Sequence, residues 1–175
     1  MMPKQSLKGK TPSVSAQIDM QMMASALLEA DQAQAEGEIP VGAVVVCEGE
    51  IIASAHNRRE QWQDPTAHAE VLALREAAKR LGRRRLSHCA LYVTLEPCAM
   101  CAGAALASGV ERVIFGAYDE RQGCTGSVYA LPEDPSLGHI PCVGGVLQKE
   151  AEQRLDVFFK GKRKKLSHED CALGE

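Results

Sequence analysis

The sequence has 175 residues, of which 45% are hydrophobic and 25% charged, and its formal net charge is −3. These values are ordinary for a soluble globular protein, and the length suits one domain with a sizeable core. No apolar run reaches membrane length and no signal-peptide pattern is present, so we expect a cytoplasmic protein with no membrane association.

The N-terminal third predicts one helix and one hairpin. Residues 1–15 show no apolar periodicity and are expected to form a flexible N-terminal extension. Apolar residues recur at helical spacing over residues 17–36, which predicts a helix. Residues 41–47 and 50–56 are two strand-like segments separated by Glu48-Gly49, which predicts a β-hairpin. Residues 57–66 then form a polar loop.

The middle of the chain alternates helices and strands. A helix is predicted over residues 66–81, after the start signals in Asp64-Pro65-Thr66. An apolar strand is predicted over residues 90–95, followed by a helix over 97–108 that is rich in small residues. Residues 112–116 are a further strand. This alternation implies helices packed on both faces of a mixed sheet.

The last part of the chain is loop-rich over residues 117–140. A short fifth strand is predicted at 141–143, and a final helix runs from residue 147 to about 165, followed by a tail at 166–175. The expected architecture is a three-layer α/β/α sandwich of the α/β class, with a mixed central sheet of about five strands. Residues 16–165 form its single domain.

Charge is distributed unevenly along the chain. Residues 11–159 hold 12 basic and 20 acidic side chains, whereas residues 160–175 hold five basic and three acidic ones. A basic run is usually only a solvated surface, but beside a nucleobase site it becomes a candidate phosphate contact. The five cations are Lys160, Lys162, Arg163, Lys164 and Lys165.

Two short motifs carry groups suited to a metal centre, namely His68-x-Glu70 and Pro97-Cys98-x-x-Cys101. One imidazole and two thiolates are good zinc ligands, and a catalytic site leaves its fourth position to water. Cys98 and Cys101 share one face of a helical turn that Pro97 is suited to start. Glu70 is then free to move protons beside zinc-activated water.

A structural zinc site and a disulfide are the two alternatives to a catalytic metal centre. A closed structural zinc site would need a fourth protein ligand. The remaining candidates have no ligand-like spacing or lie in a strand pattern; they are His88, Cys89, Cys124 and His139. A disulfide between Cys98 and Cys101 would leave His68 and Glu70 without a role, and seven cysteines with this spacing favour metal and reduced thiols.

Together the two motifs resemble the signature of the zinc-dependent nucleobase deaminases of the cytidine and deoxycytidylate deaminase superfamily. The stretches around them, over roughly residues 17–165, resemble more narrowly the bacterial-type tRNA-specific adenosine deaminases. These stretches are Glu38-Ile39-Pro40-Val41-Gly42-Ala43-Val44, Asn57-Arg58, Asp64-Pro65-Thr66-Ala67-His68-Ala69-Glu70, Val93-Thr94-Leu95-Glu96-Pro97-Cys98, Phe115-Gly116-Ala117-Tyr118-Asp119, residues 123–127, and Phe158-Phe159. The family often has Asn-His where this chain has Gly138-His139, and a small alanine at Cys124.

The resemblance implies a cytidine deaminase-like fold for residues 16–165 and a homodimer with one zinc ion per chain. It implies hydrolytic deamination of adenosine to inosine at the wobble position of a tRNA anticodon, with Glu70 as proton shuttle. Asn57 would contact the flipped base and Asp119 its ribose. The residues expected along the anticodon stem-loop are Phe158, Phe159, Lys160, Lys162 and Arg163.

Each substrate contact has a structural alternative. Asn57 could close the hairpin exit, Asp119 could cap a turn, and the two phenylalanines could belong to the core. Two other functions also remain open. One is a free-base or nucleoside deaminase, such as guanine deaminase, which shares Pro-Cys-x-x-Cys. The other is a non-enzymatic zinc-containing module that binds RNA.

Overall fold

A computed structural model describes residues 12–172 of the chain, with side chains described through Arg163. Residues 1–11 of the expected extension and 173–175 of the expected tail lie outside the described residues. Five strands form one sheet in the order β2-β1-β3-β4-β5. They are β1 (Gly42–Cys47), β2 (Glu50–His56), β3 (Cys89–Leu95), β4 (Arg112–Ala117) and β5 (Cys142–Val143).

The sheet is mixed, as the sequence predicts. Strand β1 pairs antiparallel with both β2 and β3, whereas β3, β4 and β5 run parallel to one another. The predicted β1–β2 hairpin turns at Glu48 and Gly49, which have φ angles of 52° and 85°. Two successive left-handed residues suit the twist of a tight hairpin.

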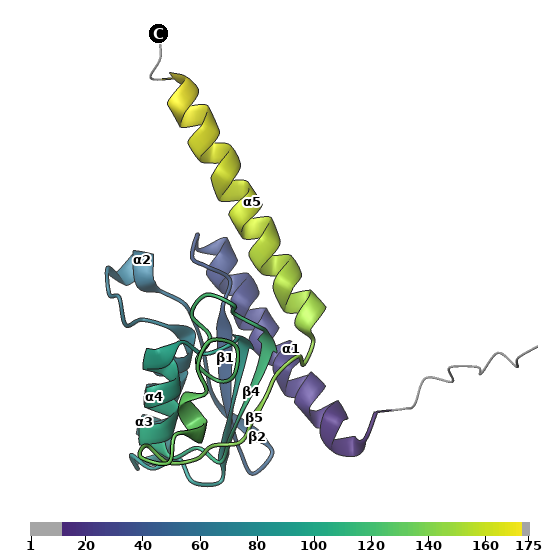
Figure 1. Cartoon of the computed structure of the whole chain (residues 1–175), viewed down its shortest axis with the longest axis vertical. Helices are drawn as coiled ribbons and strands as arrows, with labels where there is room; N and C mark the ends of the chain where they lie inside the picture. Colours follow the sequence, from purple (N-terminus) through teal and green to yellow (C-terminus); the bar gives the residue numbers. More distant parts are fainter. Residues whose placement is uncertain (1–11, 173–175) are drawn as a thin grey trace, which may run out of the picture.

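Five α-helices and one 3₁₀ turn complete the described fold. The elements are α1 (Val14–Ala35), α2 (Arg59–Trp62), α3 (Ala69–Leu81), α4 (Ala99–Ser108), the turn η1 (Leu131–Glu133) and α5 (Gln148–Ala172). Helices α3 and α4 cover one face of the sheet, and α1 with the first part of α5 covers the other (Figure 1). This is the predicted α/β/α sandwich.

Strand alternation divides the core between the two faces. Val45 packs with Ala73 and Ala77 of α3, whereas its neighbour Val44 packs with Met23 of α1. Gly42 lies where α1 comes closest to β1, because a Cβ at this position would overlap the backbone of α1 at Ala26. The absence of a side chain at Gly42 therefore lets α1 pack directly on β1.

Helix starts differ from the sequence prediction where local hydrogen bonds hold the chain extended. The Asp64 carboxylate accepts from the backbone N–H of Thr66 at 2.8 Å, and α3 begins only at Ala69. Pro97 does not open α4, which begins at Ala99, because its carbonyl accepts from the N–H of Cys124 at 2.8 Å. The sequence predicts no helix inside the polar loop, where the structure has the short helix α2.

The two terminal helices are both longer than predicted. Helix α1 begins at Val14, because the Ser13 hydroxyl accepts from the N–H of Ala16 at 3.3 Å and caps the helix. Helix α5 continues past residue 165 to Ala172. Its first part packs on the sheet through Ala151, and its second half projects away from the body (Figure 1). None of the helices within residues 12–172 is long and apolar enough to cross a membrane.

Candidate functional site

Three potential metal ligands meet where helices α3 and α4 begin. His68 and Cys98 are the N-cap residues of α3 and α4, and Cys101 lies in the first turn of α4. Nδ1 of His68 lies 3.8 Å from Sγ of Cys98 and 3.5 Å from Sγ of Cys101. Two helix N-termini therefore converge on one point, as predicted, and their partial positive charge favours thiolates there.

The spacing of these atoms fits a tetrahedral zinc ion. Ordinary zinc–sulfur and zinc–nitrogen bond lengths place the two ligand atoms roughly 3.6 Å apart at a tetrahedral angle. All three ligand atoms lie within 4.8 Å of one another, and no further His, Cys, Asp or Glu of the described chain joins the group. Three protein ligands with a fourth position left over are the pattern of a catalytic zinc site rather than a structural one.

The protonation of the two thiols also fits a cation. A hydrogen bond from the Cys101 thiol, with the adjacent His68 imidazole, holds the pKa of Cys98 well below its ordinary value. The same contact with Cys98, together with burial, raises the pKa of Cys101. A divalent cation at this point would stabilise both sulfurs as thiolates.

Glu70 lies beside the ligands without being one of them. It is the second residue of α3, and its side chain is buried against the triad. Burial raises the pKa of its carboxyl group, and the nearby His68 imidazole opposes that shift. A carboxyl group held next to the fourth metal position is placed for proton transfer rather than for ligation.

Asn57 is buried close to the triad and is held by a carboxylate that sequence reasoning missed. Its Nδ2 donates to Oε2 of Glu38 at 2.9 Å, while Oε1 of Glu38 accepts from the N–H of Gln61 at 2.7 Å. The next residue, Arg58, donates its N–H to the carbonyl of Ala67 at 3.0 Å. This bond places the Asn57 segment against the chain that enters His68.

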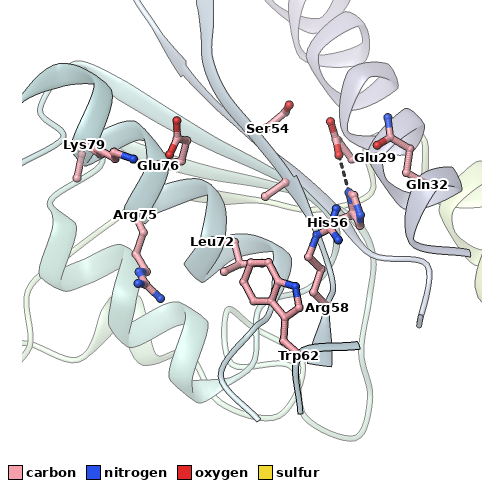
Figure 2. A pocket seen from close by; sticks show the side chains of 12 residues that line it. Glu29, Gln32, Ser54, His56, Arg58, Trp62, Leu72, Arg75, Glu76 and Lys79 are labelled. Atoms are coloured by element: carbon pink, nitrogen blue, oxygen red, sulfur yellow. Dashed lines mark hydrogen bonds and ion pairs between the residues drawn. The ribbon is translucent and has the colours of Figure 1, made fainter. Parts of the chain in front are cut away.

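A cavity of about 810 Å³ opens on the other side of this segment, between α1, β2 and α3. Figure 2 shows His56 on its wall, hydrogen-bonded to Glu29 at 2.8 Å. Arg58 forms an ion pair with Glu36 at 3.1 Å and stacks on Trp62. None of the three metal ligands lines this cavity. These contacts fix the chain on both sides of Asn57.

Asp119 follows β4, and its carboxylate caps a turn. Oδ1 accepts from the N–H groups of Arg121 and Gln122 at 2.9 and 3.1 Å, which is the structural role that the sequence left open. Its own N–H donates to Oε2 of Glu96 at 3.0 Å. Burial by itself would raise the pKa of the Glu96 carboxyl group. Hydrogen bonds, of which those from Ser127 are the strongest, outweigh this effect and lower the pKa below its ordinary value.

A hollow of about 310 Å³ adjoins the metal ligand Cys98. The start of α4, with Cys98 and Met100, forms one wall, and the loop after Asp119 forms the other, with Cys124 and Tyr129. Cys124 is buried there but does not belong to the ligand group. His139 is exposed in the loop before β5.

The expected RNA-contacting residues of α5, residues 158–163, lie near the middle of that helix, whose second half projects away from the body (Figure 1). Phe158 and Phe159 meet edge to face with ring centroids 5.5 Å apart, and Phe159 is 42% exposed. The alternative that Phe159 belongs to the core is therefore wrong. The amino group of Lys162 lies 5.0 Å from the centroid of the Phe158 ring. Lys160 and Arg163 are exposed beside it, and the side chains of Lys164 and Lys165 lie outside the described ones.

Comparison with known proteins agrees with this geometry. Residues 16–117 match the family described as the cytidine and deoxycytidylate deaminase zinc-binding region. A tRNA-specific adenosine deaminase of Bacillus subtilis (strain 168) is 50% identical over 144 residues, which cover 82% of this chain and 89% of the relative.

Solved structures show the same fold. One structure from a study of A-to-I editing by tRNA:A34 deaminases at the wobble position superposes with a TM-score of 0.75 at 39% identity, covering 77% of this chain and 99% of that chain. A guanine deaminase from Nitrosomonas europaea superposes with a TM-score of 0.66 at 25% identity, covering 90% of this chain and 98% of that chain.

Proposed function

Because the chain belongs to the tRNA-specific adenosine deaminases of the cytidine and deoxycytidylate deaminase family, we propose that it converts adenosine to inosine at the wobble position of a tRNA anticodon. The observation that carries this proposal is the His68, Cys98 and Cys101 triad with buried Glu70 beside it. A carboxyl group next to a three-ligand metal site is the arrangement that hydrolytic deamination of a nucleobase needs.

His68, Cys98 and Cys101 would hold one zinc ion per chain. When bound, the ion supplies Lewis-acid activation of a water molecule at neutral pH. The Glu70 carboxylate accepts a proton from the attacking water and delivers it to N1 of the purine as the oxygen bonds to C6. It then helps to protonate the departing amine, so that ammonia leaves and inosine remains.

The first turn of α4 contributes in a second way. The N–H groups of an initial helical turn have no partners within the helix, and those of α4 begin at the metal ligand Cys98. Such donors stabilise negative charge as it develops on the reacting base. They require no movement during the reaction, because the helix already holds them in place.

Asn57 and Asp119 would contact the flipped nucleotide. The Glu38 carboxylate occupies one N–H of the Asn57 amide, which leaves the amide oxygen and the second N–H for the base. Asp119 keeps Oδ2 for the ribose, because its contacts within the turn use only Oδ1. A base taken out of the stack is read by hydrogen bonds of this kind.

The middle of α5, residues 158–163, would lie along the anticodon stem-loop. Lys160, Lys162 and Arg163 supply cations for phosphates, while Phe158 and Phe159 offer aromatic rings for stacking. Residues 11–159 carry a net negative charge, which repels RNA phosphates. RNA should therefore bind preferentially along the basic part of this helix. A free base has no phosphates for these cations to hold.

Assembly and location are further parts of the proposal. We infer a homodimer, which the exposed apolar side chains around the hollow beside Cys98 support, Val128 and Tyr129 among them. Sedimentation equilibrium of the purified chain measures the mass of the assembly, which should be twice that of one chain. The cytoplasm is the expected location of an enzyme that acts on tRNA, and imaging of a tagged chain in its own cells tests it.

Inosine mapping in total tRNA after incubation with the purified chain tests the activity. The expected result is inosine at position 34 of one or more tRNAs, with ammonia released in equal amount. Deamination of free guanine without inosine in tRNA would instead assign the chain to the guanine deaminases. Tight RNA binding without ammonia release would make it a non-enzymatic module.

A further inference from the structure

Glu96 is a buried carboxylate placed between the sheet and the metal ligands. It follows the last residue of β3 and precedes Pro97 and the ligand Cys98. Only 2% of its surface is exposed, and the deamination chemistry proposed above does not use it. A buried carboxylate is retained only where several donors satisfy it.

Five donors from a distant segment converge on this one side chain. Oε1 accepts from the N–H of Ser127 at 2.9 Å, and from the N–H and hydroxyl of Thr125 at 3.2 and 3.3 Å. Oε2 accepts from the N–H of Asp119 at 3.0 Å and from the hydroxyl of Ser127. All five donors belong to residues 119–127, here called the 119–127 loop.

Two further features tie the 119–127 loop to the same place. A Cβ at Gly123 would overlap the Glu96 carboxylate and the carbonyl of Asp119, so the loop has room only for glycine there. The N–H of Cys124 donates to the carbonyl of Pro97 at 2.8 Å. The loop therefore contacts both residues that precede the ligand Cys98, namely the side chain of Glu96 and the carbonyl group of Pro97.

This loop forms one wall of the hollow that adjoins Cys98, and it carries Asp119. We propose that Glu96 is a positioning residue, which fixes the 119–127 loop against the metal-ligand segment and so sets the affinity of the site for its nucleotide. The inference rests on the proposed function. Glu96 does not touch the reacting atoms and acts only through the loop.

The charge and shape of the side chain make it suited to this task. A carboxylate accepts at every lone pair and donates nowhere, which matches a set of donors. Glutamine has nearly the same shape, but its NH₂ group would face N–H donors at one of the two positions. Glu96→Gln should therefore release part of the loop while leaving the packing around it intact.

Glu120→Gln is the matched control. Glu120 is exposed in the same loop, so this variant removes the same charge but keeps the Glu96 contacts. Both variants are compared with the wild type for zinc content, for hydrogen exchange without substrate, and for deamination kinetics on an adenosine-bearing anticodon stem-loop. Gly123→Ala perturbs the contact from the loop side, in case Glu96→Gln does not fold.

For Glu96→Gln we expect unchanged zinc content and amide exchange that is about tenfold faster within residues 119–127 only. KM should rise about tenfold while kcat changes less than about threefold, because the loop positions Asp119 for contact with the nucleotide and takes no part in the proton transfers. Gly123→Ala should show the same pattern, and Glu120→Gln should resemble the wild type.

If the amide-exchange rates within residues 119–127 and the KM were the same in Glu96→Gln as in Glu120→Gln, the proposal would be overturned. Loss of zinc, or a fall in kcat with KM unchanged, would also overturn it, since Glu96 would then act on the metal centre. If the wild type itself forms no inosine, the proposed function fails, while the exchange measurement still decides whether Glu96 holds the loop.

Discussion

Nδ1 of His68 lies 3.5 Å from Sγ of Cys101, although the two residues are 33 positions apart. Strand β3 lies between them in the sequence and in the middle of the sheet. The two side chains meet because α3 and α4 pack on the same face of that sheet and begin close to each other. The geometry of the triad is thus set by the fold rather than by one local motif.

The purified chain should contain one zinc ion, measured by elemental analysis. Cys98→Ser should lose most of it, because a serine hydroxyl is a much poorer zinc ligand than a thiolate. Cys124→Ser is the control, since Cys124 is buried close to Cys98 but lies outside the ligand group, and it should keep its zinc. X-ray absorption that finds four protein ligands would contradict a catalytic site.

Glu70→Gln should bind zinc normally but lose deamination by roughly 10²–10⁴-fold, because both proton transfers pass through this carboxyl group. Single-turnover assays on an anticodon stem-loop measure the loss. Glu76→Gln lies on the same helix, where the Glu76 carboxylate pairs with Arg80 at the surface, and this variant should keep full activity. Substantial turnover by Glu70→Gln would mean that another group moves the protons.

Asn57→Asp should destabilise the protein by about 1–3 kcal/mol, because it replaces an N–H donor with a second carboxylate facing Glu38. The free energy of unfolding from urea titration at neutral pH gives the measurement. Adding Glu38→Gln restores one donor and one acceptor, because the new amide at position 38 can donate to the carboxylate at position 57. The double variant should therefore recover most of the lost free energy of unfolding. If the two substitutions were simply additive, the side chains would not be coupled.

Neutralising Lys160, Lys162 and Arg163 to glutamine should weaken binding to an anticodon stem-loop and leave the zinc in place. Each lost phosphate contact should reduce the slope of log affinity against log salt by about 0.7–0.9, for a total of roughly two to three. The control removes three exposed cations outside α5, Arg75, Lys79 and Arg84. Equal slopes in the two triple variants would mean that α5 is only a solvated surface.

Gly42→Ala should destabilise the fold by about 1–3 kcal/mol, because the new methyl group has no room against the backbone of α1. Gly103→Ala offers a contrast, since nothing lies within 4 Å of its added carbon. Within α4 it should stabilise by about 0.5–1 kcal/mol. Urea unfolding of both variants checks the pair, and equal effects would contradict the close approach of α1 to β1.

The sequence alone predicts the layers, the hairpin and the metal triad, because each depends on short-range periodicity or on ligand chemistry. It places the starts of α3 and α4 two or three residues early, since the Asp64 turn and the Pro97–Cys124 bond hold the chain extended there. The single turn α2 is missed because it depends on Gln61 donating to Glu38, a contact across 23 positions.

Two buried carboxylates, Glu38 and Glu96, are the functional residues that sequence reasoning missed. Both lie in stretches that carry the family resemblance, directly before an apolar strand or a ligand segment. That position was the available signal, because an acidic residue inside a buried stretch must have partners. The partners themselves come from loops 19 to 31 positions away, and no local pattern indicates them.

The three metal ligands stand outside the hydrophobic clusters that join the strands to α1, α3, α4 and α5. In a zinc finger, binding of the ion and folding of the chain are one event. Here the apolar core supplies the stability, and the ion adds only what mass action gives a ligand of the native state. In a cell short of zinc, the protein should therefore remain folded but inactive. Binding of zinc would then restore activity without a new folding step.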